Sequence, residues 1–273
     1  MRRRENLLLL LLMAPAAAAF AAFWLLPMAR LAAVAGSGPL GIAAYAAILT
    51  NPRYFASLVA TILLSAGVTG ATLLLAGVAG VFLARNYFPG RSLLLALLTF
   101  PLAFPGVVVG FMVIMLAGRQ GFIGDIVFRL SGSRLVFAYS MTGLFMGYLY
   151  FSIPRVILTV IAGAEKLDAA LEEAARSLGA GRWRIVRDVI IPGLRPALIS
   201  SGAICFATSM GAFGTAFTLA TNIDVLPMTI YTEFTLNANF AMAASLSLVL
   251  GFITWLVLAL ARSAAGSGVA AAA

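Results

Sequence analysis

The stretch EAARSLGAGRWRIVRDVIIP occupies residues 173–192 and separates two long apolar runs of the chain. It concentrates charge and glycine in a polypeptide that is otherwise 63% hydrophobic and only 10% charged. This composition, with a mean hydropathy of +1.06, lies far outside the averages of soluble domains. The chain is therefore expected to be an integral membrane protein that exposes one polar segment between its spans.

On both sides of this stretch, apolar windows exceed the roughly 20 residues that cross a bilayer as a helix, and the alternating pattern of an outer-membrane barrel is absent. The expected fold is all-α, because a helix satisfies its own backbone groups in lipid. The whole chain, 1–273, is expected to be a single transmembrane domain with its core at about 58–262. The six predicted spans are about 7–26, 58–83, 93–116, 135–162, 197–220 and 241–261.

The first predicted span follows a basic start, Arg2-Arg3-Arg4, and so resembles a secretory signal peptide. Its apolar run continues through Trp24 and Leu25, beyond the roughly 7 to 15 residues of a signal core. An uncleaved span is favoured, with a cleaved signal as the alternative.

Basic residues indicate the orientation of the spans, since they gather on the cytoplasmic side. With a cytoplasmic N-terminus, most of the 18 basic residues fall inside, including Arg155 and those of the 165–195 loop. The residues left outside are Arg30, Arg53, Arg119, Arg129 and Arg134. Both termini and the polar stretch are therefore expected in the cytoplasm. The positive charge indicates topology rather than a nucleic-acid partner, since no basic patch interleaved with aromatic residues is visible.

Several chemistries are excluded by what the sequence lacks. It has no histidine and one cysteine, Cys205, which excludes disulfide frameworks and His-based zinc sites and triads. The only lysine, Lys166, does not lie in a phosphate-binding loop, so no cofactor or catalytic residue is expected and any ATP binds to another subunit. The spans are expected to carry no charge, which argues against an ion-coupled symporter.

The 165–195 loop reads as two short helices around Gly179. Asp168 is the expected N-cap of the first helix, and Gly179 its C-terminal stop. Glu172 and Arg176 are expected to pair on the solvated face. The predicted buried stripe consists of Leu171, Ala174, Ala175 and Leu178.

The second helix of the loop is expected to begin at Arg182, with Trp183, Val186 and Ile190 on one face. Pro192 is expected to end this helix and mark the return to the membrane. The plain alternative is a connector whose alanines only pack and whose arginines only hold the loop inside.

The spacing of the whole stretch resembles the cytoplasmic EAA loop of membrane subunits in bacterial ATP-binding-cassette (ABC) importers of the type I fold. That family's pattern is EAA, three residues, G, nine residues, I, one residue and LP. The matching residues are Glu173, Ala174, Ala175, Gly179 and Pro192. Val189 and Ile191 replace the isoleucine and leucine conservatively, and the loop lies between the fourth and fifth predicted spans, as in the family.

The resemblance implies a coupling role rather than catalysis. The hairpin would dock in a cleft of a cytoplasmic ATPase dimer that binds the ATP, with Glu173 as an anchor and Trp183 stiffening the hairpin. It also implies a bacterial inner-membrane location, a periplasmic substrate-binding protein and a second permease subunit, with a different chain favoured over an identical one. The spermidine/putrescine group is favoured, and iron(III), sulfate, thiamine and aminoethylphosphonate remain open. The alternative from another class is a self-contained secondary transporter or channel.

Candidate path residues lie outside the loop. Pro101 and Pro105 are expected to break the start of the third span, as a gate element or as a simple kink. The GxxxG pairs Gly106/Gly110 and Gly143/Gly147 are expected to serve helix packing. A polar series beside Gly211 and Gly214 either lines the path or bonds back to its own helix: Thr208, Ser209, Thr215, Thr218, Thr221 and Asn222.

The external segment between the fifth and sixth spans has acidic and polar residues but no basic residue. It is expected to meet a binding protein or a cationic solute, or to be only a solvated loop. Its residues of interest are Asp224, Tyr231, Glu233, Asn237 and Asn239.

Overall fold

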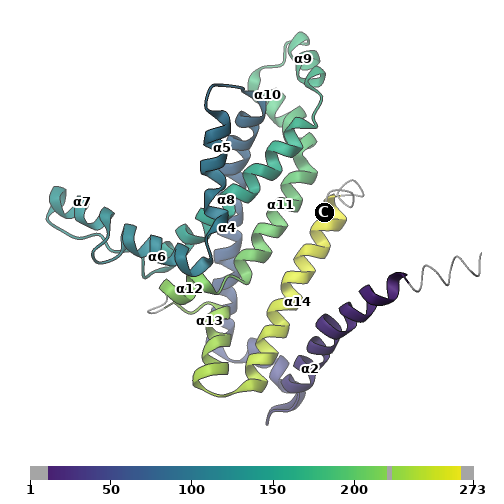
Figure 1. Cartoon of the computed structure of the whole chain (residues 1–273), viewed down its shortest axis with the longest axis vertical. Coiled ribbons are helices and arrows are strands. Elements are labelled where there is room, and N and C mark those ends of the chain that lie inside the picture. Colours follow the sequence, from purple (N-terminus) through teal and green to yellow (C-terminus); the bar gives the residue numbers. More distant parts are fainter. Residues whose placement is uncertain (1–11, 220–222, 266–273) are drawn as a thin grey trace, which may run out of the picture. The chain divides into compact units, whose positions relative to one another are not determined.

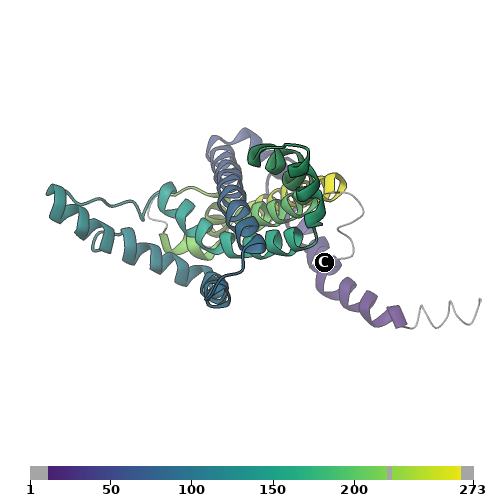
Figure 2. The ribbon, with the colours of Figure 1, turned by 90° about the horizontal axis from the view of Figure 1, so that it is seen from above.

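The structure is a computed structural model that describes residues 12–219 and 223–265 (Figures 1 and 2). Within these ranges the chain is helical and contains no strand. Six helical segments among the described residues are long and apolar enough to cross a membrane. The predicted all-α fold with six spans is confirmed, and so is a polar hairpin between the fourth and fifth spans.

Short π and 3-10 turns connect or interrupt several of the α-helices. In chain order the elements are η1 (Ala21–Leu25), α2 (Leu26–Ala35), η2 (Gly41–Tyr45), α3 (Ala47–Thr50), α4 (Pro52–Arg85), α5 (Arg91–Thr99), η3 (Phe100–Ala103), α6 (Gly106–Ala117), α7 (Phe122–Ser131), α8 (Met141–Glu165), α9 (Ala169–Ser177), α10 (Arg182–Ile185), η4 (Val186–Ile190), α11 (Ile191–Met210), α12 (Gly214–Leu219), α13 (Leu226–Tyr231), η5 (Thr232–Leu236) and α14 (Phe240–Ala265).

The chain divides into two compact units. The described part of the first comprises residues 12–55 and 229–251. Its first spanning helix runs over Leu12–Ala35, well beyond the predicted end at residue 26, whereas residues 7–11 of that prediction lie outside the described chain. Glu233 in η5 is 4% exposed and accepts a hydrogen bond from Asn237 Nδ2 at 3.0 Å. The expectation of a solvated loop is therefore wrong at Glu233.

The second unit comprises residues 56–228 and 252–265 and contains the helices around α8. In the most apolar 18-residue window of the α8 span 56% of the residues are buried, and α8 packs along α11 and against α5, α6 and α12. Small residues permit this close approach. A Cβ added at Gly163 would lie 2.8 Å from Ala197 Cβ, and one at Gly80 would lie 2.8 Å from Val160.

Three of the four GxxxG glycines, Gly106, Gly110 and Gly147, pack against a neighbouring helix as expected, whereas Gly143 lies against the backbone that precedes its own helix. A Cβ at Gly110 would lie 2.6 Å from Thr218, and one at Gly147 would lie 2.8 Å from the methyl group of Thr215. Both threonines belong to α12, so α6 and α8 approach the same short helix through their glycines.

The third predicted span, 93–116, is not one helix. It consists of α5 and η3, an extended residue at Phe104, and then α6 (Figure 1). Pro105 explains the break, because proline lacks an N–H group and forces the preceding residue out of the helical region. The segment long enough to span is Gly106–Ser131, which joins α6 and α7, whereas Arg91–Ala103 is a shorter apolar helix.

The fifth predicted span, 197–220, is displaced in the structure. Helix runs without interruption over Arg182–Met210 and stops before the separate helix α12. Pro192 does not end it, which corrects that expectation, because the π turn η4 lies immediately upstream. The Ile191 N–H group bonds Val186 O, five residues back. The wider π turn accommodates a proline that cannot donate to the helix.

Candidate functional site

The hairpin between α8 and α11 is capped at both ends of α9. Asp168 accepts a hydrogen bond from Ala170 N at 2.9 Å, which confirms the predicted N-cap. Gly179 has φ +79°, and its N–H group donates to Arg176 O while Ala180 N donates to Ala175 O. These two bonds form a Schellman motif, whose left-handed position favours glycine. The backbone at Gly179 therefore ends α9 sharply and starts the return toward the membrane.

An ion pair connects α9 to the end of α4. Arg85 Nη2 lies 2.6 Å from Glu172 Oε1, and the two groups meet as a close ion pair rather than an aligned hydrogen bond. Arg176 Nη2 lies 3.8 Å from the other Glu172 oxygen. The predicted Glu172–Arg176 pair is therefore present, with Arg176 exposed, but the Glu172 side chain is only 12% exposed and does not lie on the solvated face. Glu172 instead joins the hairpin to the bundle.

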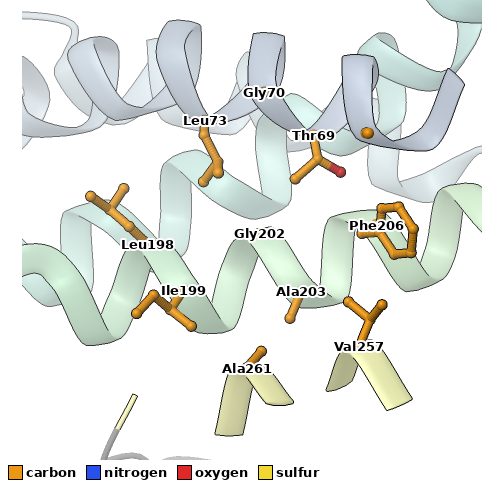
Figure 3. Close-up of a pocket in the computed structure, with 11 residues that line it drawn as sticks. Thr69, Gly70, Leu73, Leu198, Ile199, Gly202, Ala203, Phe206, Val257 and Ala261 are labelled. Atoms are coloured by element: carbon orange, nitrogen blue, oxygen red, sulfur yellow. The ribbon is translucent and has the colours of Figure 1, made fainter. Parts of the chain in front are cut away.

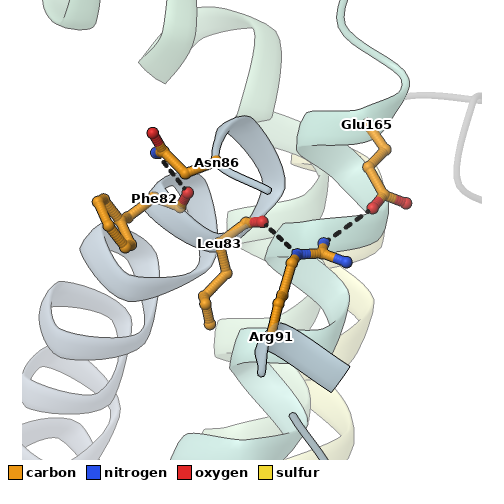
Figure 4. A network of polar contacts seen from close by, with 5 residues as sticks. All are labelled: Phe82, Leu83, Asn86, Arg91 and Glu165. Carbon is orange, nitrogen blue, oxygen red and sulfur yellow. Dashed lines mark hydrogen bonds and ion pairs between the residues drawn. The ribbon is translucent and has the colours of Figure 1, made fainter. Parts of the chain in front are cut away.

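A second polar cluster, shown in Figure 4, lies where the ends of α4 and α8 meet the start of α5. The Arg91 guanidinium donates from Nε to Leu83 O at 2.8 Å and reaches Glu165 Oε1 at 3.4 Å. Asn86 Nδ2 donates to Phe82 O at 2.8 Å, which satisfies another carbonyl at the end of α4. This cluster joins α5 to the ends of α4 and α8, and the Arg85–Glu172 pair connects α4 to the hairpin.

The sequence predicted the buried stripe of α9 wrongly, whereas in the second helix Val186 and Ile190 pack inward and only Trp183 departs from the predicted face. In α9 only Ala175 packs against the core, while Leu171 is 56% and Leu178 89% exposed. Trp183 is 74% exposed and does not stiffen the hairpin by packing. The second helix is held by Ile185 and Ile190, which are nearly buried.

The structure brings the predicted coupling residues to one end of the second unit (Figure 1). Most of them are exposed there, with Ala175 partly buried; the exposed ones are Glu173, Ala174, Gly179, Trp183, Ile191 and Pro192. Together with Leu171 and Leu178 they form a surface that is apolar in large part but carries Glu173. We call this surface the hairpin face.

A cavity of about 260 Å³ lies in the second unit, between the η3–α6 junction and the α11–α12 junction. Its lining residues are Pro101, Leu102, Phe104, Gly106, Phe151, Arg155, Thr208, Ala212, Gly214 and Thr215. Three predicted path residues, Pro101, Thr208 and Gly214, thus come together. The other three do not line it: Pro105 caps α6, Ser209 is 1% exposed, and Gly211 caps α11. Thr221 and Asn222 lie outside the described residues.

Hydrogen bonds hold the broken helices around this cavity. Tyr148 Oη donates to Ala212 O at 2.5 Å, and Thr215 Oγ1 donates to Gly106 O at 2.9 Å. Thr208 Oγ1 bonds back to Ile204 O at 2.9 Å. Irregular backbone within a membrane requires such partners, because lipid offers none.

Sequence reasoning missed Arg155. The expectation of uncharged spans is wrong at this residue, which lies inside α8 and lines the cavity. The signal was present, because position 155 falls within the predicted span 135–162 and a charge inside a span indicates a functional site. Tyr148 was missed for a different reason: its partner, Ala212 O, is 64 residues away in the chain.

A larger cavity of about 510 Å³ lies between α4, α11 and α14 (Figure 3). Its lining is almost entirely aliphatic or aromatic, and the polar exception, Thr69, donates its hydroxyl hydrogen to Ser65 O at 2.7 Å. Gly70 and Gly202 keep the helix surfaces smooth on two of its sides (Figure 3). This cavity offers little to a charged solute.

Comparison with known proteins agrees with this arrangement. Residues 76–266 match the family described as binding-protein-dependent transport system inner membrane component. The molybdenum transport system permease protein ModB of Escherichia coli K12 is 36% identical over 193 residues, which cover 68% of this chain and 81% of that protein. The sulfate transport system permease protein CysT of the same organism is 36% identical over 203 residues, 73% of this chain and 70% of that protein.

The fold also has a solved counterpart. A chain of a bacterial alginate ABC transporter, crystallised in complex with an alginate pentasaccharide-bound periplasmic protein, superposes with a TM-score of 0.82. It is 16% identical, and the superposition covers 95% of this chain and 94% of that chain. The chain therefore belongs to the family of binding-protein-dependent transport system inner membrane components, the non-catalytic permease subunits of ABC importers.

Proposed function

We propose that this permease couples to a separate ATPase through the hairpin face. The observation that carries the proposal is a helix with its apolar side turned to solvent. In α9, Leu171 and Leu178 are exposed although two ion pairs and two caps hold the helix in place. A rigid, partly apolar surface of this kind is typical of a protein docking site.

The anchoring contacts give this surface a mechanical connection to the membrane helices. Movement of α9 would pull on α4 through Arg85–Glu172, and α8 leads directly into α9 through Lys166 and Leu167. Closure of two ATPase subunits on their ATP would then rock the spans by rigid-body movement.

The remaining assembly follows from the same proposal. ATP binds to the ATPase dimer, because the chain has no phosphate-binding loop. A second permease subunit and a periplasmic binding protein complete the importer in a bacterial inner membrane. Both termini of this chain lie in the cytoplasm, on the side of the hairpin, as the distribution of basic residues indicates.

For the cargo we propose a small tetrahedral oxyanion. The support comes from the relatives, which are named as molybdenum and sulfate transport permeases. Molybdenum(VI) in neutral water and sulfate are both tetrahedral dianions. The polyamine that the sequence favoured has the opposite charge, so uptake of labelled sulfate, molybdate and spermidine by the same reconstituted importer decides between them.

The coupling proposal is tested by Gly179→Asp. A side chain at φ +79° strains the turn, and the carboxylate adds charge at the hairpin face. We expect the variant to insert normally but to lose the ATPase that co-purifies with the tagged wild-type chain from its own host. The matched control is Gly132→Asp. Gly132 also has φ +73° at a helix C-cap with open space around it, but it ends α7, outside the hairpin.

The two variants separate backbone strain from docking. Loss of the ATPase in both would mean that strain alone disturbs the protein, and retention in both would overturn the docking model. The alternative of a self-contained transporter or channel predicts gradient-driven flux in vesicles that contain this chain and no ATPase. The coupled importer predicts flux only with ATPase and ATP.

A further inference from the structure

The cavity of about 260 Å³ carries an unusual charge for a site at membrane depth. Arg155 lies ten residues before Glu165, the last residue of α8. At 1.5 Å per residue this is about 15 Å along the helix axis, roughly half the thickness of a bilayer core. A cation at that depth is costly, so it is retained where it faces a cavity or a partner.

Arg155 has no acidic partner in the part of the chain that the structure describes. The ion pairs found there involve other arginines, and none of the cavity-lining residues is a carboxylate. Arg155 is exposed and lines a cavity that offers it no counter-ion among the described residues. A small anion would therefore be attracted to this space, and a cation such as a polyamine would be repelled.

Anion binding in this cavity depends mainly on Arg155, because the hydroxyl groups of the lining already have hydrogen-bond acceptors. The hydroxyl hydrogens of Thr208 and Thr215 already go to backbone carbonyls, at 2.9 Å from Ile204 O and 2.9 Å from Gly106 O. The first turn of the twelve-residue helix α6 begins at Gly106, also in the lining, and its positive end adds to the same field. These groups supplement the guanidinium but do not replace it.

The small volume of the cavity and the exposure of Arg155 suit a site that a solute occupies briefly during transport. A volume of about 260 Å³ is below the roughly 300–1,000 Å³ of cavities that bind drug-sized ligands, so the fitting solute is small. One exposed arginine binds an anion weakly, and a transport path requires binding that is strong enough for entry and weak enough for release.

We propose that Arg155 is an anion-binding residue of the translocation path. It binds a tetrahedral oxyanion transiently in the cavity bounded by η3, α6, α8, α11, the 211–213 break and the start of α12. The inference rests on the proposed function, since it assigns the cargo class of that importer to a named residue.

The test uses the complete importer in proteoliposomes, with its ATPase, second permease and binding protein. Initial rates of ATP-driven uptake are measured with labelled sulfate and with labelled molybdate, and ATP hydrolysis is measured in parallel. Arg155→Gln is expected to lower uptake at least tenfold while stimulated ATP hydrolysis persists. Arg155→Lys retains much of the uptake because the charge remains, and Arg155→Glu abolishes it.

The matched control is Arg262→Gln, which removes the same charge from the last turn of α14, outside the cavity. It is expected to leave uptake unchanged. A second pair keeps Arg155 intact, in case its own variants fail to assemble. Thr208→Asp places a carboxylate in the cavity, and its uptake is expected to fall well below that of the neutral Thr208→Asn.

Each outcome has a separate meaning. Wild-type uptake by Arg155→Gln, or equal uptake by the two Thr208 variants, overturns the role of Arg155 while the oxyanion importer stands. A wild-type importer that moves spermidine but neither oxyanion overturns the cargo proposal and the role of Arg155 together. Lost ATP hydrolysis in Arg155→Gln, with wild-type hydrolysis in Arg262→Gln, would place Arg155 in coupling instead and also overturn the inference.

Discussion

Glu172 and Glu173 are neighbours in the chain with opposite surroundings. The Glu172 side chain is 12% exposed and pairs with Arg85, whereas Glu173 is exposed at the hairpin face. The hydrophobic periodicity of α9 did not distinguish them, because the partner of Glu172 is supplied by another helix, 87 residues earlier. The N-cap at Asp168 and the stop at Gly179 were predictable, because both depend only on local backbone chemistry.

This difference leads to a prediction for the pair. Glu172→Gln leaves the Arg85 guanidinium without its charged partner, which costs about 1–3 kcal/mol in local stability. We expect trypsin to cut the hairpin of the isolated permease several-fold faster than in wild type, because local opening of α9 exposes the chain. Glu173→Gln is the matched control and should leave the cleavage rate unchanged.

Recovery of the ATPase should distinguish the same two variants in a second way. Glu173→Gln removes a charge from the hairpin face, so it should weaken recovery of the ATPase without loosening α9. Equal cleavage rates for both variants would contradict an anchoring role of the Arg85–Glu172 pair.

At the scale of elements, one prediction from a proline was right and another was wrong. Pro105 breaks the predicted third span, as expected, since the preceding residue is extended. Pro192 was expected to end a helix, but the π turn η4 carries the helix past it. A π turn depends on how the flanking helix packs, and the buried residues Ile185, just before η4, and Ile190, its last residue, hold the chain here. Local rules do not contain that information.

The junction of α11 and α12 offers a prediction about an element boundary. Tyr148→Phe removes the hydrogen bond to Ala212 O and leaves that carbonyl without its partner beside the cavity. Loss of such a bond costs about 1–3 kcal/mol, so we expect a clear fall in melting temperature. Unfolding can be followed with a thiol-reactive dye, because the single cysteine, Cys205, is 1% exposed in the folded chain.

Tyr150→Phe is the matched control for this measurement. It removes a hydroxyl from the same helix, two residues further on, where the described residues show no hydrogen bond to Tyr150. Its melting temperature should equal that of wild type. Equal shifts for the two variants would mean that the Tyr148 hydroxyl does not stabilise the junction.

At the scale of the whole molecule, composition was enough for the membrane class and the number of spans. Six apolar runs predict six spans because about 20 apolar residues are enough for a helix to cross the bilayer core. The cavity could not be predicted in the same way. Its lining combines Pro101, Phe151, Arg155, Thr208 and Thr215 from separate segments, and their meeting depends on long-range packing. Arg155 was visible as a charge in the sequence, but its surroundings were not.

Orientation in the membrane is tested by thiol labelling, because the single native thiol, Cys205, is buried. Ser177→Cys places a thiol on α9, and Ser133→Cys places one between α7 and α8; both positions are exposed. If the hairpin is cytoplasmic, a membrane-impermeant maleimide should label Ser133→Cys in intact cells and Ser177→Cys only in inverted vesicles. Wild type should stay unlabelled on both sides, since Cys205 is buried. Labelling of both variants from the same side would contradict the predicted topology, because an odd number of spans must lie between residues 133 and 177 for the hairpin to reach the ATPase.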